Sequence, residues 1–295
     1  MKATTERVRI ALQKKGRLAD GSIDLLARCG LSVKGAKSQL MVQDETFGLE
    51  FIFARDDDIP EFVQSGVCDL GIVGDNLLEE YAQYEKNGVA VIMPLAFSRC
   101  RLSIATPKRS NISDIKDVAG KTIATSYPNT IKAYLDKNDV SAKIVVMHGS
   151  VELAPQIGVA DIICDLVASG ATLNENGLKE VLQIKQCQAV LIRNGAKLSN
   201  EKQLIVDRLI MRINGVLSAK QNRYIMLHID KDKLPLLAKI MPGAERPTVL
   251  ALNDTSDKVA VHVVSQEDVF WATMEKLKAI GASSILVLPI EKMVD

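Results

Sequence analysis

The residues with the clearest chemical potential form the segment from Asp165 to Thr172, which directly follows a short apolar run. Successive loop N–H groups and the Ser169 and Thr172 hydroxyls could surround a phosphate, and Gly170 would let the backbone approach it. Asp165 could accept hydrogen bonds from ribose hydroxyls. These residues suit a phosphoribosyl ligand, while a strand followed by a tight turn is the alternative. The segment contains no lysine, so it is not the P-loop of nucleoside triphosphatases.

A second candidate is the basic segment Gln13-Lys-Lys-Gly-Arg-Leu18, which separates a predicted strand from a predicted helix. Ligands of open α/β sheets bind beyond the carboxyl ends of the strands, so Lys14, Lys15 and Arg17 would face that crevice. Three cations in one loop favour a polyphosphate ligand. A solvated basic loop is the alternative interpretation.

Two further segments border predicted strands. Arg55 follows one strand and is a candidate ligand contact, whereas the three acidic residues after it are typical of a helix start. Another strand is preceded by Asp69 and ends at Gly74, where the backbone could come close to a base or a ribose. Asp69 and Gly74 would suit a solute-binding protein equally well.

Two more strand-to-helix loops carry polar side chains. Glu152 could reach into the same crevice, or it could simply occupy the first turn of a helix that Ser150 caps. Thr125, Ser126 and Asn129 could hydrogen-bond a sugar or a base.

The elements that must position these loops alternate between apolar, strand-like runs and amphipathic, helix-like stretches. This alternation predicts an α/β fold with parallel crossovers. Strands are predicted at 8–12, 49–53, 70–73, 102–105, 122–125, 143–147, 162–164 and 188–192, and helices at 23–29, from about 58, and at about 200–217.

The order of elements changes after a predicted break at 219–222. Strands are predicted at 224–229, 248–252, 259–264 and 284–288, with helices at 231–240 and 268–280. This βαββαβ order predicts a ferredoxin-like module with two helices on one face of an antiparallel sheet. A small module with one open sheet face tends to associate with a partner surface.

Composition excludes several classes of protein. The 295 residues are 47% hydrophobic and 25% charged, with a net charge of +1, which excludes a disordered or fibrous chain. Near-zero charge, no block of basic residues and only 4% aromatic residues argue against a nucleic acid partner. No apolar run reaches the roughly 18 residues of a membrane helix, and the first residues lack a signal sequence, so a cytoplasmic protein is expected.

The cysteines and histidines do not form a metal-binding pattern. Five scattered cysteines, mostly with apolar neighbours, are typical of reduced, buried thiols. Three histidines without a CxxC or HxxxH spacing make a zinc site improbable. A metal, if used, is expected to be Mg²⁺ that arrives with phosphate groups.

Taken together, these motifs resemble the long form of ATP phosphoribosyltransferase, the enzyme that opens histidine biosynthesis. The resemblance follows the chain in order through Lys-Lys-Gly-Arg at 14–17, Asp-Leu-Gly-Ile-Val-Gly at 69–74, Ala-Thr-Ser-Tyr-Pro-Asn at 124–129, Gly-Ser-Val-Glu at 149–152, Asp-Leu-Val-Ala-Ser-Gly-Ala-Thr at 165–172 and the closing segment at 281–289. Each motif alone is weak, and the joint match is specific.

The resemblance implies a catalytic region with two lobes arranged like a type II periplasmic binding protein, with the substrates bound between them. Lobe I would comprise 1–97 with 186–216, and lobe II would comprise 98–185. Residues 223–295 would form an ACT-like domain that binds histidine as feedback inhibitor and that the short form lacks.

The resemblance also implies roles for individual residues. The family's loop that holds the 5-phosphate and ribose of phosphoribosyl pyrophosphate corresponds to Asp165, Ser169, Gly170, Ala171 and Thr172. Position 168 is alanine here, where a serine is frequent in the family.

The reaction implied is attack of adenine N1 of ATP on C1 of phosphoribosyl pyrophosphate. Lys15 and Arg17 would stabilise the departing pyrophosphate together with Mg²⁺, Asp165 would lie near the ribose, and Arg55 is a less certain helper.

In the C-terminal domain, Asp230, Ala244, Thr248 and Ser284 match positions that surround the bound amino acid in the family. The family further implies homodimers and hexamers. Two other functions stay open from the sequence: a cytoplasmic two-lobed ligand-binding or sensor protein, and a regulatory subunit without catalytic activity.

Overall fold

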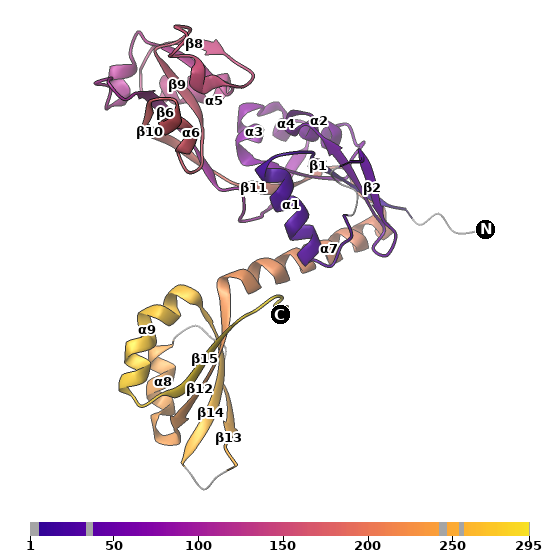
Figure 1. Ribbon diagram of the computed structural model, residues 1–295. Helices are drawn as coiled ribbons and strands as arrows, with labels where there is room; N and C mark the ends of the chain where they lie inside the picture. Colours follow the sequence, from indigo (N-terminus) through magenta and orange to yellow (C-terminus); the bar gives the residue numbers. More distant parts are fainter. Residues whose placement is uncertain (1–5, 34–37, 242–246, 254–256, 295) are drawn as a thin grey trace, which may run out of the picture. The chain divides into compact units, whose positions relative to one another are not determined.

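The computed structural model describes residues 6–33, 38–241, 247–253 and 257–294. The chain forms two compact units, of which the first comprises Met1–Ala27 with Leu31–Ile205 and the second comprises Arg28–Gly30 with Val206–Asp295. The first unit contains two β-sheets and the second contains one (Figure 1).

The first sheet has six strands in the order β2-β3-β1-β4-β11-β5. They are β1 (Val8–Gln13), β2 (Met41–Asp44), β3 (Leu49–Ala54), β4 (Leu70–Gly74), β5 (Val89–Pro94) and β11 (Ala189–Asn194). β3, β1 and β4 run parallel, and β11 runs antiparallel to β4 and β5. The three parallel strands consist largely of buried residues, as expected for strands covered on both faces.

Short helices connect these strands and cover the sheet. They are α1 (Arg17–Arg28), η1 (Asp56–Asp58), α2 (Ile59–Gln64), α3 (Asp75–Glu80) and α4 (Gln83–Lys86). α2 packs closely on β4 at Gly71, where an added Cβ would lie 2.8 Å from Ile59 and 3.0 Å from Val63. A larger residue at Gly71 would therefore push the helix away from the sheet.

The second sheet has five strands in the order β10-β6-β9-β7-β8. They are β6 (Cys100–Pro107), β7 (Thr122–Thr125), β8 (Lys143–Val146), β9 (Ile162–Val167) and β10 (Leu178–Cys187), accompanied by η2 (Ile115–Val118), α5 (Pro128–Lys137), η3 (Val151–Leu153) and α6 (Ala171–Glu175). β9, β7 and β8 run parallel, whereas β6 runs antiparallel to β9 and β10. Separate apolar clusters cover the two faces of this sheet.

The chain passes between the two sheets once after β5 and again between β10 and β11. The two passages are hydrogen-bonded to each other, because the N–H of Ala189 donates to the carbonyl of Phe97 at 3.1 Å.

The second unit holds most of the long helix α7 (Asn200–Gln221) and an antiparallel sheet in the order β13-β14-β12-β15. Its elements are β12 (Asn222–Asp230), η4 (Lys231–Lys233), α8 (Leu234–Ile240), β13 (Thr248–Ala251), β14 (Lys258–Gln266), α9 (Glu267–Ala279) and β15 (Ser283–Pro289). Ile225, Leu227 and Ile229 alternate along β12 and pack with Leu237 of α8 and Leu277 of α9, so both helices cover one face.

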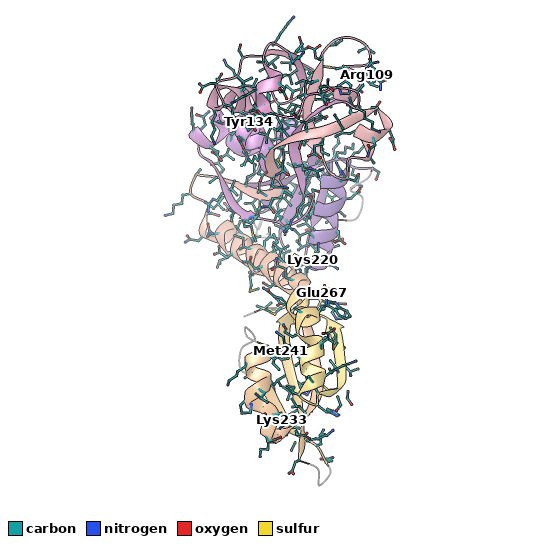
Figure 2. All side chains as sticks on the ribbon, turned by 90° about the vertical axis from the view of Figure 1, so that its left-hand side faces the viewer. Arg109, Tyr134, Lys220, Lys233, Met241 and Glu267 are labelled. Carbon is teal, nitrogen blue, oxygen red and sulfur yellow. The ribbon has the colours of Figure 1, made fainter. Side chains whose placement is uncertain are left out.

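The ends of this unit are fixed by side-chain contacts. Met241, after α8, is 6% exposed and packs into the same core (Figure 2). Arg223 bonds the carbonyl of Lys220 at 3.3 Å and forms an ion pair with Glu267 at the start of α9. Lys220 and Glu267 lie at the same end of the unit (Figure 2).

The predicted strands and helices are all present, with bounds that differ by a few residues. Three strands were not predicted, namely β2, β5 and β10, and all three lie at the edge of a sheet. β2 and β10 carry polar residues, which weaken the apolar signal of a strand, whereas β5 is apolar throughout and was missed although its signal is present. The prediction of parallel crossovers is correct for β3, β1 and β4 and for β9, β7 and β8. It is wrong for β6 and β11, because the chain crosses to the other sheet and returns.

Candidate active site

The segment that the sequence singled out forms the edge of a pocket in the second sheet. β9 continues to Val167, so Asp165 lies within the strand, opposite Ser103 of β6, rather than at its end. Gly170 has a φ of +80°, in the left-handed region that glycine adopts without strain. A cavity of about 370 Å³, here called the loop pocket, is lined by residues 165–173 with Arg17, Glu152 and Ile163.

Burial dominates the electrostatics of Asp165. It raises the pKa of the carboxyl to about 6, and the nearby Glu152 carboxylate adds to the rise. The N–H of Leu166 donates to Asp165 at 2.7 Å and opposes this shift. Asp165 is therefore a carboxylate that burial makes costly to ionise and that a hydroxyl donor or a cation would stabilise.

The basic segment lies between β1 and α1. Gly16 has a φ of +96°, which allows the tight turn, and the N–H of Lys14 donates to the carbonyl of Ala54 at 2.9 Å. Arg17 lines the loop pocket and also a larger pocket of about 480 Å³. No carboxylate in the described part of the chain forms an ion pair with Arg17, so its charge is available to a ligand.

The larger pocket is lined by residues from both sheets of the first unit. They are Gln13, Gly16, Arg17, Leu18, Asp56, Gly74, Asn76, Leu77, Ser98, Arg99, Cys100, Tyr127, Leu166, Gln188 and Ala189. Arg17 and Leu166 line both pockets, so the two cavities are neighbours.

Gly74 reaches the larger pocket at the carboxyl end of β4, as predicted from its position. An added Cβ at Gly74 would lie 2.2 Å from Oδ1 of Asn76, so a side chain there would require the Asn76 side chain to move.

Asp69 precedes the opposite end of β4, and the structure does not bring it to either pocket. Its two carboxylate oxygens each accept a bond from Lys202 Nζ at 2.9 Å, and one also accepts from the N–H of Arg9 at 2.9 Å. Asp69 was predicted to bind substrate, and in the structure its carboxylate instead pairs with Lys202 and bonds the backbone of β1.

Three predicted cations lie outside the lining of the pockets, namely Lys14, Lys15 and Arg55. Lys15 and Arg55 are exposed, and Arg55 precedes η1 without a side-chain capping bond. The acidic residues after Arg55 do lie at a helix start, because they form η1 directly before α2, and Glu152 lies in the first turn of η3. Neither Asp58 nor Ser150 makes a side-chain capping hydrogen bond. Asp56 lines the larger pocket.

The loop before α5 serves the fold more than it serves a ligand. Ser126 donates to the carbonyl of Met147 at 2.7 Å, and Thr125 accepts from the N–H of Tyr127 at 2.9 Å. The buried carboxylate of Glu80 accepts from the N–H of Asn129 at 2.8 Å.

The same carboxylate of Glu80 accepts from the N–H and the hydroxyl of Thr130, at 2.9 and 2.7 Å. Sequence reasoning missed this role, since Glu80 and Thr130 are 50 residues apart.

Sequence reasoning also missed Tyr127 and Asn76 as pocket residues. Burial and the Asp165 carboxylate raise the pKa of the Tyr127 hydroxyl above its ordinary range, so it remains a neutral donor. The position of Asn76 two residues after β4, in the first turn of α3, could have indicated it, because residues at that end of a parallel strand lie at the crevice.

The residues predicted to surround an amino acid in the second unit are only partly close together. Asp230 ends β12, and Ser284 lies near the start of the neighbouring strand β15. Thr248 lies on β13, which β14 separates from β12. Thr248 and Met226 of β12 both pair with His262 of β14, so Thr248 is about 10 Å from β12 across the sheet. Ala244 lies outside the described residues.

The described residues contain no group of three or more His, Cys, Asp or Glu side chains that could hold a metal ion. The loop pocket offers two carboxylates, Asp165 and Glu152.

In the described ranges, no helix is long and apolar enough to span a membrane.

Comparison with known proteins places this geometry in a family. The profile of ATP phosphoribosyltransferase matches residues 55–215, and the profile of that family's C-terminal domain matches residues 219–292. The ATP phosphoribosyl transferase (HisG:HisZ) complex from Thermotoga maritima is a similar solved structure, with 25% identity and a TM-score of 0.57 over 70% of this chain and 98% of that chain.

Two periplasmic proteins are less similar. The sulfonate-binding protein SsuA from Methylobacillus flagellatus KT has 20% identity and a TM-score of 0.48 over 71% of this chain and 67% of that chain. The alkanesulfonate-binding protein SsuA from Xanthomonas axonopodis pv. citri has 16% identity and a TM-score of 0.46 over 70% of this chain and 72% of that chain.

The two sheets joined by paired crossings and followed by an antiparallel βαββαβ module define a two-lobed α/β protein of the periplasmic-binding-protein type with an ACT-like C-terminal domain. The chain belongs to the ATP phosphoribosyltransferase family and, with both regions matched, to its long form. Members of this family are pentosyltransferases that act at the first step of histidine biosynthesis.

Proposed function

We propose that this chain transfers the 5-phosphoribosyl group of phosphoribosyl pyrophosphate to N1 of the adenine of ATP. The N1–C1 bond forms as the bond from C1 to the pyrophosphate oxygen breaks, with inversion at C1. N1 already carries a free lone pair, so no strong base is needed to create the nucleophile. The protein's contribution is alignment of the two substrates and stabilisation of developing charge.

The loop pocket is the proposed site of the 5-phosphate and ribose. Ser169 and Thr172 offer hydroxyls, and the left-handed turn at Gly170 lets N–H groups of the loop approach a phosphate. Asp165 would accept bonds from the ribose hydroxyls, and these donors would stabilise its buried carboxylate. The raised pKa of Asp165 supports this proposal, because perturbed carboxyls concentrate in ligand sites.

The single observation that carries the proposal is that Arg17 lines both pockets. ATP in the larger pocket and phosphoribosyl pyrophosphate in the loop pocket would then share one unpaired guanidinium. A pyrophosphate leaving C1 would develop its charge next to Arg17, with Lys15 on the same exposed turn as a second cation. Arg55 remains a proposed helper from outside the pockets.

Mg²⁺ fits this donor set as a cation held chiefly by substrate phosphates. Asp165 and Glu152 provide at most two carboxylates, and Mg²⁺ is typically bound by one or two carboxylates plus phosphate oxygens. When bound, the ion supplies charge neutralisation of the pyrophosphate oxygens.

The test is a turnover assay with ATP, phosphoribosyl pyrophosphate and Mg²⁺ on Arg17→Ala, Arg17→Lys and the control Arg109→Ala. Arg109 is an exposed arginine in the turn after β6, and it lines neither pocket (Figure 2). Losing one preorganised charge should lower turnover on the order of 10²- to 10³-fold, and lysine should restore part of it. Normal turnover of Arg17→Ala would remove Arg17 from the mechanism, and no product from the unmodified chain would refute the proposed reaction.

We further propose that 1–97 with 186–216 and 98–185 act as the two catalytic lobes and that 223–295 binds histidine as feedback inhibitor. The separate sheets support the two lobes, and the neighbouring positions of Asp230 and Ser284 support an effector site at that end of the third sheet. Asp230→Asn should raise the inhibitory histidine concentration at least several-fold without changing turnover. Inhibition that disappears on competition with excess phosphoribosyl pyrophosphate would instead place histidine in the catalytic site.

Assembly into dimers and hexamers is also proposed. Its support is the exposed apolar side chains on strands of the third sheet, Val249, Leu250, Leu286 and Leu288, which are 41–52% exposed. Light scattering on the full chain, with and without histidine, measures the populated oligomer, and a monomer at micromolar concentration would contradict the proposal.

A further inference from the structure

A half-buried ion pair lies beside the loop that the proposed function assigns to the 5-phosphate. Nε of Arg101 in β6 donates to Oε1 of Glu180 in β10 at 2.6 Å, and Nη2 contacts the second oxygen of the same carboxylate. Ser103, which is fully buried, donates its hydroxyl to Oε1 of Glu180 at 2.8 Å. The fork-to-fork geometry leaves Nη1 of Arg101 free to make one more bond.

That remaining bond goes to the loop itself. Nη1 of Arg101 donates to the carbonyl of Ala168 at 2.9 Å. The carbonyl of a trans peptide points opposite to the N–H of the next residue, so holding the Ala168 carbonyl toward Arg101 turns the N–H of Ser169 away from the ion pair. The direction of the Ser169 N–H is therefore fixed by the Arg101 side chain, which two contacts with Glu180 hold in place.

The ion pair itself is not arranged to meet a ligand. Arg101 and Glu180 are absent from the lining of both pockets, although Ala168 and Ser169 line the loop pocket. The carboxylate compensates the guanidinium charge, and the hydrogen bonds from Arg101 hold the pKa of Glu180 below its usual value. Arg101 thus acts on the site through geometry rather than through its charge.

We propose that Arg101, oriented by Glu180 and Ser103, is a positioning residue that presets the phosphate-facing conformation of the 168–172 loop. This inference rests on the proposed function, in which that loop binds the 5-phosphate of phosphoribosyl pyrophosphate. Its consequence is selective: disturbing Arg101 should weaken phosphoribosyl binding and leave ATP binding largely unchanged.

The test compares Arg101→Lys and Glu180→Gln with Arg7→Lys in the full chain. Arg7 makes a single 2.6 Å contact with Glu45 in the part of the unit that holds the first sheet, and neither residue lines a pocket. Its variant controls for loss of an Arg–Glu pair away from the site. Lysine keeps the charge at 101 but cannot bond Glu180 and Ala168 together. KM for each substrate, kcat, and calorimetric binding of ribose 5-phosphate are measured.

Arg101→Lys should raise KM for phosphoribosyl pyrophosphate and Kd for ribose 5-phosphate about 10- to 100-fold, with KM for ATP changed less than about 2-fold. Glu180→Gln should shift the same two constants by a smaller factor, and it replaces the lysine variant if that fails to fold. Equal rises in both KM values, or unchanged ribose 5-phosphate binding in a folded variant, would overturn the inference. An unmodified chain that binds ribose 5-phosphate but makes no adduct would refute the proposed reaction and leave this inference intact.

Discussion

Replacing Asp165 by Asn should make the empty protein more stable while it damages the proposed function. The folded pKa of Asp165 is about 6 against an ordinary value of 3.8, so the folded state disfavours the carboxylate. For a carboxyl whose folded pKa is raised, stability falls as pH rises from the unfolded to the folded pKa and stays low above it. The rise from 3.8 to about 6 corresponds to about 3 kcal/mol at pH 8.

Asn has nearly the same shape as Asp, and its carbonyl oxygen can still accept the 2.7 Å bond from the N–H of Leu166. Asp165→Asn should therefore gain about 3 kcal/mol in unfolding free energy at pH 8 and only about 1 kcal/mol at pH 4.5. Urea unfolding followed by fluorescence and circular dichroism at both pH values measures the two differences. Turnover of the same variant should fall on the order of 10²-fold.

Two outcomes would contradict this reasoning. A variant that is equally or less stable at pH 8 would show that burial does not penalise the Asp165 carboxylate. A stability gain that is the same at pH 8 and pH 4.5 would trace the effect to packing rather than to ionisation. Asp161→Asn is the matched control. Asp161 is an exposed aspartate just before β9, and its side chain lines neither pocket.

Three further predictions concern the first unit. Glu80→Gln replaces one acceptor oxygen by an NH₂ group that would face a backbone N–H donor, of Asn129 or of Thr130. The unfolding free energy, measured by urea unfolding, should fall by about 3 kcal/mol. Gly74→Ala should force the Asn76 side chain to rotate within the larger pocket. The KM for ATP should then rise several-fold while Tm changes by only about 2 °C. An unchanged KM would exclude ATP from the larger pocket. Iodoacetamide at pH 7.5 should label Cys100 first, because a hydrogen bond from Cys187 lowers the pKa of the Cys100 thiol. ATP should slow this labelling, because Cys100 lines the larger pocket. Mass spectrometry identifies the labelled residue, and another cysteine labelled first would refute the prediction.

Local sequence signals were sufficient for the central elements of the fold. The predicted bounds of β7 match those observed, and the C-terminal βαββαβ order is found as predicted, because buried central strands and amphipathic helices carry strong periodic patterns. Edge strands such as β10 were missed, since their residues are half-exposed and their pairing is interrupted by bulges. The antiparallel course of β11 was also missed, because it depends on how the chain returns from another sheet.

For the site, the sequence by itself determined the loop from Asp165 to Thr172, the glycine turn before Arg17, and the family to which they belong, because these are local residue patterns. Only the tertiary structure decided that Arg17 lines both pockets and that Asp69 pairs with Lys202 instead of facing them. The support of the loop by Arg101 was likewise invisible in the sequence. Such contacts join residues that are tens of positions apart, and their pairing is set by sheet order and strand register, which no local pattern encodes.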